Sequence, residues 1–294
     1  MSFLLQSLLR LGAQITSAFC CHSHTQRGVG PLLRALRRLG RVGFVPQVVK
    51  RHGRRWLITD LRNNAQEAVF FGLPYDPQVT EMLRAVLKPG DIAIDVGANV
   101  GFFTSEMASL VGTTGRVLAF EPAIEHSRVL CANLALQNLT QVEVWPVALG
   151  ARRERVIHYT TASSGSVVSS FPELGVPLAT ARTISLEALD SIVDASTARH
   201  LRCIKIDVDG NEQEVVLGAK KLLTAARPCI IIEVSERTQQ AAGSTAAALL
   251  AVVEKLGYRF SAGPCAPRLC AEELLAAADL RSQMDILCVP ACEE

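Results

Sequence analysis

The chain has 294 residues, 49% of them hydrophobic and only 5% aromatic, which suits one large domain with a mostly aliphatic core. No apolar run reaches the roughly 20 residues that a membrane span needs. The nine cysteines include no C-x-x-C pair, so the composition argues against a disulfide framework or a zinc site and favours reduced thiols in the cytoplasm.

The net charge of +2 hides an asymmetry, because residues 1–59 hold ten Arg and Lys and no acid. We therefore interpret residues 1–59 as a basic amphipathic arm and residues 60–294 as the main domain. In the arm, Leu32, Leu33, Leu36 and Leu39 form an apolar stripe among arginines.

Three interpretations of this arm stay open: contact with an anionic membrane surface, a helix packed on the main domain by its leucines, and an organelle transit segment. Trp56 is isolated from other aromatic residues, so the interleaving typical of single-stranded nucleic-acid binding is missing and we expect no nucleic acid. The expected location is the cytoplasm, with peripheral membrane contact as the open alternative.

From residue 91 onward, short apolar runs alternate with helical patterns. This alternation predicts an α/β fold with a parallel sheet covered on both faces. The predicted strands are 91–97, 116–121, 142–148, 203–209 and 229–235, followed in the tail by "YRFSAG" and "MDILCVP". The predicted helices are 101–111, 123–138, 211–226, 244–256 and 272–280.

Residues 151–202 interrupt this alternation. They combine the strand-like "RERVIHYTT", the Ser- and Gly-rich "TASSGSVVSS" and "ARTISLEALDSIV". An insert of this kind often carries specificity.

The stretch "DIAIDVGANVGFFT" places Asp95, Gly97 and Gly101 where the first of these strands ends and a helix begins. A glycine permits a left-handed backbone or the close approach of a ligand, and the helix N-terminus offers free N–H groups to an anionic group. The dinucleotide fingerprint G-x-G-x-x-G is absent. Twenty residues past Gly101, the next strand ends in Glu121, whose carboxylate can accept both ribose hydroxyls. A nucleoside without pyrophosphate, such as S-adenosylmethionine, fits this pattern.

The fourth strand, in "CIKIDVDGNEQE", has Lys205, Asp207 and Asp209 on one face. Charged residues on a central strand must pair or meet a ligand. An internal Lys205–Asp207 ion pair with Asp209 as a helix cap is one interpretation, and a functional acid pair is the other. A fifth strand brings Glu233 to the same edge of the sheet.

Taken together, "AIDVGANVGFFT", "VLAFEP", "PVALG", "SSGSVVSS", "RTISLEALD", "IKIDVDGNEQEVVLGAKKLL" and "RPCIIIEVS" follow one another in an order that resembles the FkbM-type methyltransferases, over about residues 60–290. The resemblance implies a seven-stranded, doubly wound, mostly parallel sheet in the order 3-2-1-4-5-7-6. It also implies S-adenosylmethionine as cofactor and O-methylation of a sugar, a lipid-linked glycan or a secondary metabolite. Asp209 stands where the family has glutamate.

The resemblance implies that the methionine part of the cofactor lies against one group of residues: Asp95, Gly97, Ala98, Asn99 and Gly101. Glu121 would hold the ribose, and Ala148 and Leu149, at the end of the third strand, would lie near the adenine. Asp207 and Asp209 would face the methyl group and the acceptor.

We expect Asp207 or Asp209 to orient or deprotonate an acceptor hydroxyl, with His158 in the insert as another candidate base. Asp207, Asp209 and Glu233 have the hard oxygen ligands that divalent cations prefer, but no dedicated ligand spacing, so we expect no metal. Two alternatives remain: a nucleotide-dependent oxidoreductase on a related sheet, and a cofactor-binding module without catalysis. The sequence does not indicate an oligomeric state.

Overall fold

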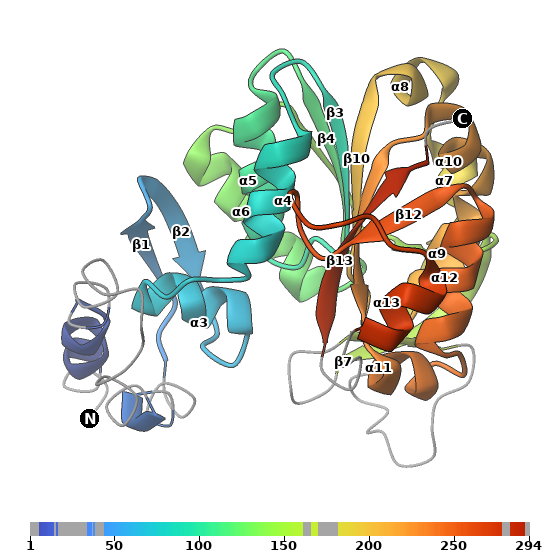
Figure 1. Ribbon diagram of the computed structural model, residues 1–294. Coiled ribbons are helices and arrows are strands. Elements are labelled where there is room, and N and C mark those ends of the chain that lie inside the picture. The colour runs from blue at the N-terminus through green and yellow to red at the C-terminus, as the bar shows by residue number, and fades with distance from the viewer. Residues whose placement is uncertain are drawn as a thin grey trace.

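The computed structural model describes residues 6–14, 16, 34–36, 38, 44–160, 166–169, 182–277 and 283–291. Its centre is a seven-stranded sheet with α-helices on both faces (Figure 1). The α/β prediction with a large, mostly parallel sheet is therefore confirmed.

The sheet strands are β3 (Ile92–Val96), β4 (Arg116–Phe120), β5 (Val142–Trp145), β10 (Leu201–Ile206), β11 (Cys229–Val234), β12 (Tyr258–Ser261) and β13 (Met284–Pro290). They lie in the order β5-β4-β3-β10-β11-β13-β12. Strand β13 is antiparallel to both of its neighbours, and the other pairings in this sheet are parallel. Because β3 and β10 are adjacent and central, the turns that follow them meet at one edge of the sheet.

Alternate residues of the central strands pack in opposite directions, as a strand's two-residue period requires. On one face, Ala93 and Val117 contact α4 (Pro77–Val86) and α5 (Phe102–Val111), and Ala119 contacts α6 (Ile124–Gln137). On the other face, Ile94 and Ile204 join a larger core.

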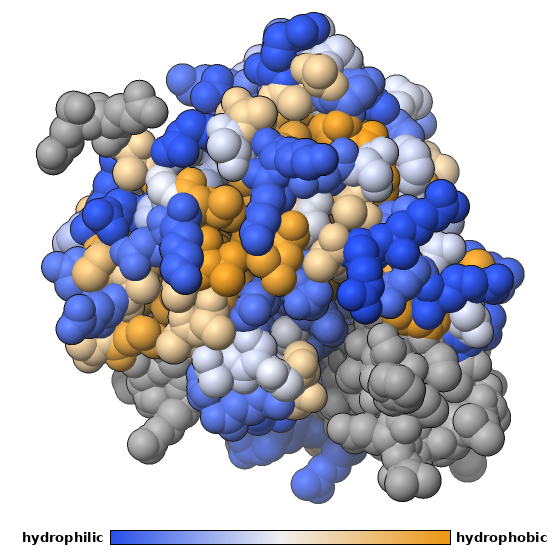
Figure 2. All heavy atoms as spheres, turned by 90° about the vertical axis from the view of Figure 1, so that its right-hand side faces the viewer, coloured by the Kyte–Doolittle hydropathy of each residue, from blue (hydrophilic) through white to orange (hydrophobic). Residues whose placement is uncertain are grey.

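This larger core is covered by α9 (Glu212–Gly218), α10 (Lys220–Ala226), α12 (Ala246–Lys255) and α13 (Ala271–Ala277). Figure 2 shows the molecule from this side, with an apolar area in the middle of the face and hydrophilic residues around it. The sequence predicted a single helix over 211–226, but the structure has two helices that meet at Ala219. The Asp190 carboxylate accepts the N–H groups of Lys221 and Leu222, and thereby caps the second helix.

The insert contributes a second, four-stranded sheet in the order β6-β9-β7-β8. Its strands are β6 (Ala148–Leu149), β7 (Glu154–Thr160), β8 (Ser166–Ser169) and β9 (Arg182–Glu187), and α7 (Leu189–Ile192) and α8 (Ala195–His200) follow. Ala148 and Leu149 thus belong to β6 and not, as predicted, to the third strand of the main sheet. Pro146 lacks the N–H that a continued strand would need, and β5 ends just before it.

The N-terminal region contains an antiparallel hairpin that the sequence did not predict, β1 (Gln47–Arg51) and β2 (Arg54–Ile58), followed by α3 (Asn64–Phe71). Leu9 and Leu36 share a buried cluster with Trp56 and with residues of α3. Trp56 also stacks on Phe102 at the start of α5, with 5.8 Å between the ring centroids. Within the described ranges, no helix combines the length and apolar character that crossing a membrane requires.

Candidate active site

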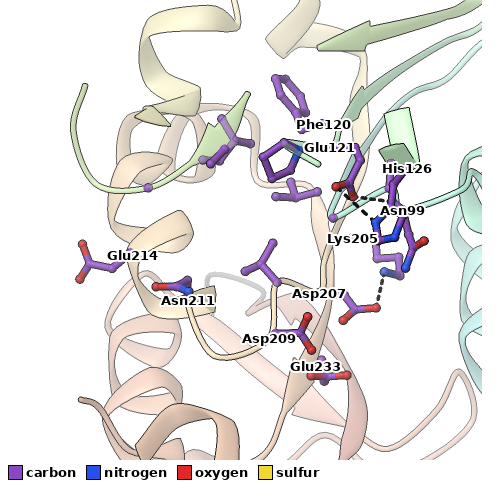
Figure 3. Close-up of a pocket in the computed structure, with 18 of the residues that line it drawn as sticks. Asn99, Phe120, Glu121, His126, Lys205, Asp207, Asp209, Asn211, Glu214 and Glu233 are labelled. Carbon is purple, nitrogen blue, oxygen red and sulfur yellow. Dashed lines mark hydrogen bonds and ion pairs between the residues drawn. The ribbon is translucent and has the colours of Figure 1, made fainter. Parts of the chain in front are cut away.

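A cavity of about 640 Å³ opens at the carboxyl ends of β3, β4, β10 and β11. Ligands of open α/β sheets bind at this edge. The cavity has two distinct ends in Figure 3: Asn99, Glu121 and His126 lie at one, and Asp207, Asp209 and Glu233 at the other. The second sheet and α3 supply further lining residues.

The glycine turn after β3 has left-handed backbone angles at Gly97 (φ 80°), Asn99 (φ 50°) and Gly101 (φ 88°). A Cβ atom on Gly97 would lie 1.8 Å from the carbonyl oxygen of Asp207, and one on Gly101 would lie 2.4 Å from Leu130. The left-handed backbone favours glycine at both positions, and at Gly97 the contact with a backbone atom also excludes any side chain. Gly97 lets the turns after β3 and β10 approach each other closely enough to form one cavity wall.

Glu121 follows β4 and is only 4% exposed. Its Oε2 accepts a 2.8 Å hydrogen bond from the N–H of Asn99, and its Oε1 accepts a 2.8 Å bond from the N–H of Ala123. A carboxylate offers about four lone-pair directions, so acceptor capacity is left on both oxygens for a ligand diol.

His126, in the first turn of α6, also lines the cavity, and its Nδ1 lies 3.8 Å from Glu121 Oε1. Burial alone would lower the pKa of His126, but the carboxylates of Glu121, Glu125 and Asp60 together outweigh burial and raise the pKa above the ordinary value. The sequence analysis missed this histidine, although its place five positions after Glu121 was the available signal.

An apolar wall lies beside Glu121. Phe120 stacks on Trp145 with a centroid distance of 6.0 Å, and Phe120 itself lines the cavity. Ala148 and Leu149 line the same wall, together with Val156 and Leu186 of the second sheet. A flat, apolar wall next to a diol-accepting carboxylate suits a purine nucleoside.

Lys205 on β10 is 2% exposed and lies between Asp95 of the neighbouring strand β3 and Asp207, which directly follows β10. Its Nζ donates a 2.8 Å hydrogen bond to Asp207 Oδ2, lies 4.0 Å from Asp95 Oδ1, and is 5.0 Å from the centroid of the Phe103 ring. Burial disfavours the charge of Lys205, but Asp207 and Asp95 together raise its pKa above the ordinary value, so the ammonium group stays charged. The predicted Lys205–Asp207 ion pair is thus present, and Lys205 also lines the cavity.

Asp95 is 1% exposed and does not line the cavity. Its Oδ2 accepts a 2.6 Å hydrogen bond from Thr104 Oγ1, while Oδ1 has no hydrogen-bond partner. Burial raises the pKa of Asp95, and Lys205 and Thr104 oppose this shift. Asp95 therefore affects the cavity indirectly, because it helps to keep the Lys205 ammonium group charged.

The turn after β10 presents Asp209 to the cavity with a left-handed backbone (φ 54°). Aspartate adopts this conformation more readily than glutamate, which gives a physical reason for the shorter side chain here. Glu212 stabilises the turn that carries Asp209, because its Oε1 accepts hydrogen bonds from the N–H groups of Val208 (2.9 Å) and Gly210 (3.1 Å). Glu212 is fully buried and also accepts a hydrogen bond from Gln239 Nε2. Burial raises the pKa of Glu212 to about 7.

The acidic end of the cavity contains Glu233, as the sequence predicted, in addition to Asp207 and Asp209. Glu233 is 3% exposed, and its Oε1 accepts a hydrogen bond from Gln283 Nε2. Burial, followed by the nearby carboxylates of Asp207 and Glu212, raises the pKa of Glu233 well above the ordinary value. Burial and Asp207 also raise the pKa of Asp285 to about 7 and that of Asp76 above its usual range. A positively charged ligand group bound at this end would favour the ionised forms of these carboxyl groups and would lower their raised pKa values.

Most of the predicted site residues line this single cavity: Gly97, Ala98, Asn99, Glu121, Ala148, Leu149, Asp207 and Asp209. Asp95 and Gly101 lie outside the lining. The backbone of His158 lies in β7, opposite Arg182, but its side chain is outside the described part of the structure. Sequence reasoning missed Tyr75 and Asp76, which come from the region before the first sheet strand and line the cavity.

In the part of the chain that the structure describes, no group of three or more His, Cys, Asp or Glu side chains is placed to hold a metal ion. The fold and the cavity define a class of protein: an α/β enzyme that binds a nucleoside at the carboxyl edge of its sheet.

The chain belongs to the FkbM methyltransferase family. The family described as "Methyltransferase FkbM domain" matches residues 95–260, which is more than half of the chain. Residues 95–260 are therefore a methyltransferase domain of this family, and S-adenosylmethionine is the cofactor that such a domain uses. This assignment removes the oxidoreductase alternative.

Among the curated proteins, the AMB antimetabolite synthetase AmbE of Pseudomonas aeruginosa is 27% identical over 75% of this chain, and the chain spans only 12% of its length. Among the solved structures, the FkbM methyltransferase of Methylobacillus flagellatus is 15% identical, with a TM-score of 0.43, over 76% of this chain and about half (52%) of the other. A SAM-dependent O-methyltransferase of Thermotoga maritima is 15% identical, with a TM-score of 0.41, over 84% of this chain and 78% of the other.

The residues of the cavity fit S-adenosylmethionine. Glu121 offers acceptor positions for the two ribose hydroxyls, and the wall of Phe120, Ala148 and Leu149 offers an apolar surface for adenine. The carboxylates at the other end suit a positively charged sulfur. When bound, this cofactor supplies a methyl group on a sulfonium that an acceptor atom attacks in line.

Proposed function

We propose that the protein methylates a hydroxyl group of a small-molecule acceptor: a sugar, a lipid-linked glycan or a secondary metabolite. The observation that carries this proposal is the juxtaposition of Asp207, Asp209 and Glu233 at the end of the cavity opposite Glu121 (Figure 3). The similarity to an antimetabolite synthetase supports a secondary metabolite as the acceptor.

The two acids of the β10 turn have different surroundings. The Lys205 ammonium group holds Asp207 in one orientation through a 2.8 Å hydrogen bond, so Asp207 is suited to orienting an acceptor hydroxyl. Asp209 is exposed to the cavity on a turn that Glu212 holds, and is suited to receiving the hydroxyl proton. The proton would then reside on the carboxylate, the acceptor oxygen would bond to the methyl carbon, and the bond from that carbon to sulfur would break, with S-adenosylhomocysteine as the leaving group.

Alignment of the two reactants contributes most to such a reaction, up to roughly 7–11 kcal/mol in the best intramolecular cases. General-base assistance adds about 10²–10⁴ in rate. The fixed turns after β3 and β10, joined at Gly97, are the elements that would provide this alignment.

Incubation with S-adenosylmethionine carrying a labelled methyl group, together with fractions of a cell extract, tests the proposal. Mass spectrometry of the labelled product identifies the acceptor and the methylated atom. We expect an O-methylated small molecule, and a product methylated on nitrogen or carbon would contradict the proposed reaction.

The roles of the acids are tested with Asp207→Asn and Asp209→Asn on that acceptor, with the exposed Glu272→Gln as a matched control. We expect turnover to fall by about 10²-fold or more in Asp209→Asn. Unaltered turnover in both Asp variants would remove these acids from the chemistry. If the wild-type protein binds S-adenosylmethionine but labels no fraction, it is a binding module without catalysis.

A further inference from the structure

The N-terminal region exposes large apolar side chains to an extent that the rest of the described structure does not. Leu8 (47% exposed), Leu11 (54%), Val45 (48%) and Val48 (46%) are four of the six exposed large hydrophobic residues in the described ranges. Such a concentration on one small region is typical of an interaction surface.

The helix formed by residues 6–14 has a buried apolar side and, outside that side, the exposed leucines Leu8 and Leu11. Leu9 and Ala13 are buried and pack with Leu36, and a Cβ on Gly12 would lie 2.3 Å from Leu36 Cδ1. At 3.6 residues per turn, Leu11 projects about 160° away from Leu9 and Leu8 about 100° away from it. Leu9 and Ala13 already pack the helix onto the protein, so Leu8 and Leu11 are available for an external partner.

The N-terminal region also carries exposed positive charges. Arg10, Arg34, Arg38, Lys50 and Arg55 are all exposed. Among the described residues, no carboxylate lies within ion-pair distance of any of these five, whereas Arg54 pairs with Glu106. Surface cations of a folded domain usually have acids interspersed with them.

The hairpin β1–β2 places like charges directly opposite each other. Lys50 pairs in register with Arg55, and Arg51 with Arg54. Like charges at directly opposite positions destabilise a strand pair. On the same outer face, Val48 pairs with Leu57. An anionic surface would relieve the repulsion between Lys50 and Arg55 and would also accept Val48.

We propose that this N-terminal surface (exposed Leu8, Leu11, Val45 and Val48 with the five cations that have no ion-pair partner among the described residues) docks onto an anionic lipid surface. The apolar side chains enter the interface between headgroups and acyl chains, while the cations contact lipid phosphates. A nucleic acid would match the positive charge but would leave the exposed leucines and valines without a function, so the combination favours a membrane.

Flotation of the full chain with two kinds of vesicle tests the proposal: phosphatidylcholine alone, and phosphatidylcholine mixed with phosphatidylglycerol. We expect binding to the anionic vesicles that falls steeply in 1 M salt, where the screening length drops to about 3 Å. Equal recovery with both kinds of vesicle, or no recovery with either, would overturn the proposal.

Two double variants separate the apolar from the electrostatic contribution. We expect Leu8→Asp/Leu11→Asp and Lys50→Ser/Arg55→Ser each to weaken vesicle binding by about tenfold or more. The matched controls are Leu275→Asp, at an exposed leucine of α13, and Lys220→Ser/Lys255→Ser, which removes two exposed charges elsewhere. Both controls should bind vesicles like the wild type.

Calorimetric titration with S-adenosylmethionine shows that each variant is folded, and it does not depend on the methyl acceptor. Wild-type affinity of Leu8→Asp/Leu11→Asp for anionic vesicles would contradict the proposal. So would binding to a single-stranded oligonucleotide that outcompetes the vesicles, because the partner would then be a nucleic acid. Methyl-transfer activity does not enter any of these outcomes, so they stand apart from the proposed function.

Discussion

The carboxylate of Glu121 accepts a 2.8 Å hydrogen bond from the backbone N–H of Asn99, which ties the end of β4 to the glycine turn after β3. A second backbone N–H, from Ala123, binds the other oxygen. The side chain is thereby fixed in one orientation at the cavity wall, with its remaining lone pairs available to a ribose diol.

Glu121→Gln should weaken S-adenosylmethionine binding. The amide loses the negative charge and places an NH₂ group against one of the two backbone N–H donors. We expect the dissociation constant to rise by about tenfold to a hundredfold, because hydrogen bonds to charged groups are worth about 1.5–3 kcal/mol. Isothermal titration calorimetry measures this change. Glu125→Gln, at the exposed neighbouring carboxylate that pairs with Arg182, should retain wild-type affinity.

Gly97→Ala should be much more damaging than Gly112→Ala. Both glycines have positive φ angles, 80° and 67°, so each alanine adds backbone strain of about 1–3 kcal/mol. Only at Gly97 does the new Cβ meet a backbone atom, the Asp207 carbonyl oxygen at 1.8 Å, while the space around Gly112 is open. Chemical denaturation should show a clearly larger loss of stability for Gly97→Ala, together with loss of cofactor binding. Equal stability of the two variants would show that the turns after β3 and β10 do not meet this closely.

Glu212→Ala should loosen the turn that carries Asp209. The substitution leaves the N–H groups of Val208 and Gly210 without an acceptor in a buried place, at about 1–3 kcal/mol each. We expect unfolding free energy and kcat to fall together. In Glu212→Gln an amide oxygen still accepts both N–H groups, so this variant should retain most of the stability. If Glu212→Ala leaves kcat unchanged, the turn does not depend on Glu212.

Glu233→Gln should stabilise the protein at neutral pH. Burial and neighbouring carboxylates raise the pKa of Glu233 in the folded state, so the folded protein keeps a proton that the unfolded chain releases above its ordinary pKa of 4.5. The folded state then binds more protons, and its stability falls as pH rises, by up to about 1.4 kcal/mol per pH unit.

The glutamine variant lacks this proton linkage. Its advantage in unfolding free energy over the wild type should therefore grow from about pH 5 to about pH 7. Denaturant titrations at several pH values measure this difference. The exposed Glu272→Gln should follow the wild-type slope, and a Glu233→Gln slope equal to the wild type would show that Glu233 is ionised in the folded protein.

The main sheet and one half of the cavity followed from local patterns in the sequence. Apolar runs and their spacing located the sheet strands, and the acids at strand ends converged because parallel strands share a carboxyl edge. Glu121, Asp207 and Asp209 could be placed at the cavity in this way. Lys205 could be paired with Asp207 from the two-residue period of β10.

The remaining features depend on contacts between distant segments. Ala148 pairs with Leu186 in a second sheet, and no local pattern reports that pairing. The hairpin containing Trp56 was not predicted, because the many basic residues of this region led to its interpretation as a basic helical arm. The position of Asp95 at the end of a sheet strand is typical of a ligand-binding residue. Its side chain nevertheless faces Lys205 and not the cavity, because β3 and β10 are adjacent in the sheet.

The central claim is that S-adenosylmethionine binds in this cavity with its ribose on Glu121. A crystal structure with S-adenosylhomocysteine, the product of methyl transfer, tests it most directly. The account predicts the nucleoside between the turn at Asn99 and the wall of Phe120, with both ribose hydroxyls on the Glu121 carboxylate and the sulfur directed toward Asp207 and Asp209. A nucleoside bound elsewhere, or one whose ribose makes no contact with Glu121, would contradict it.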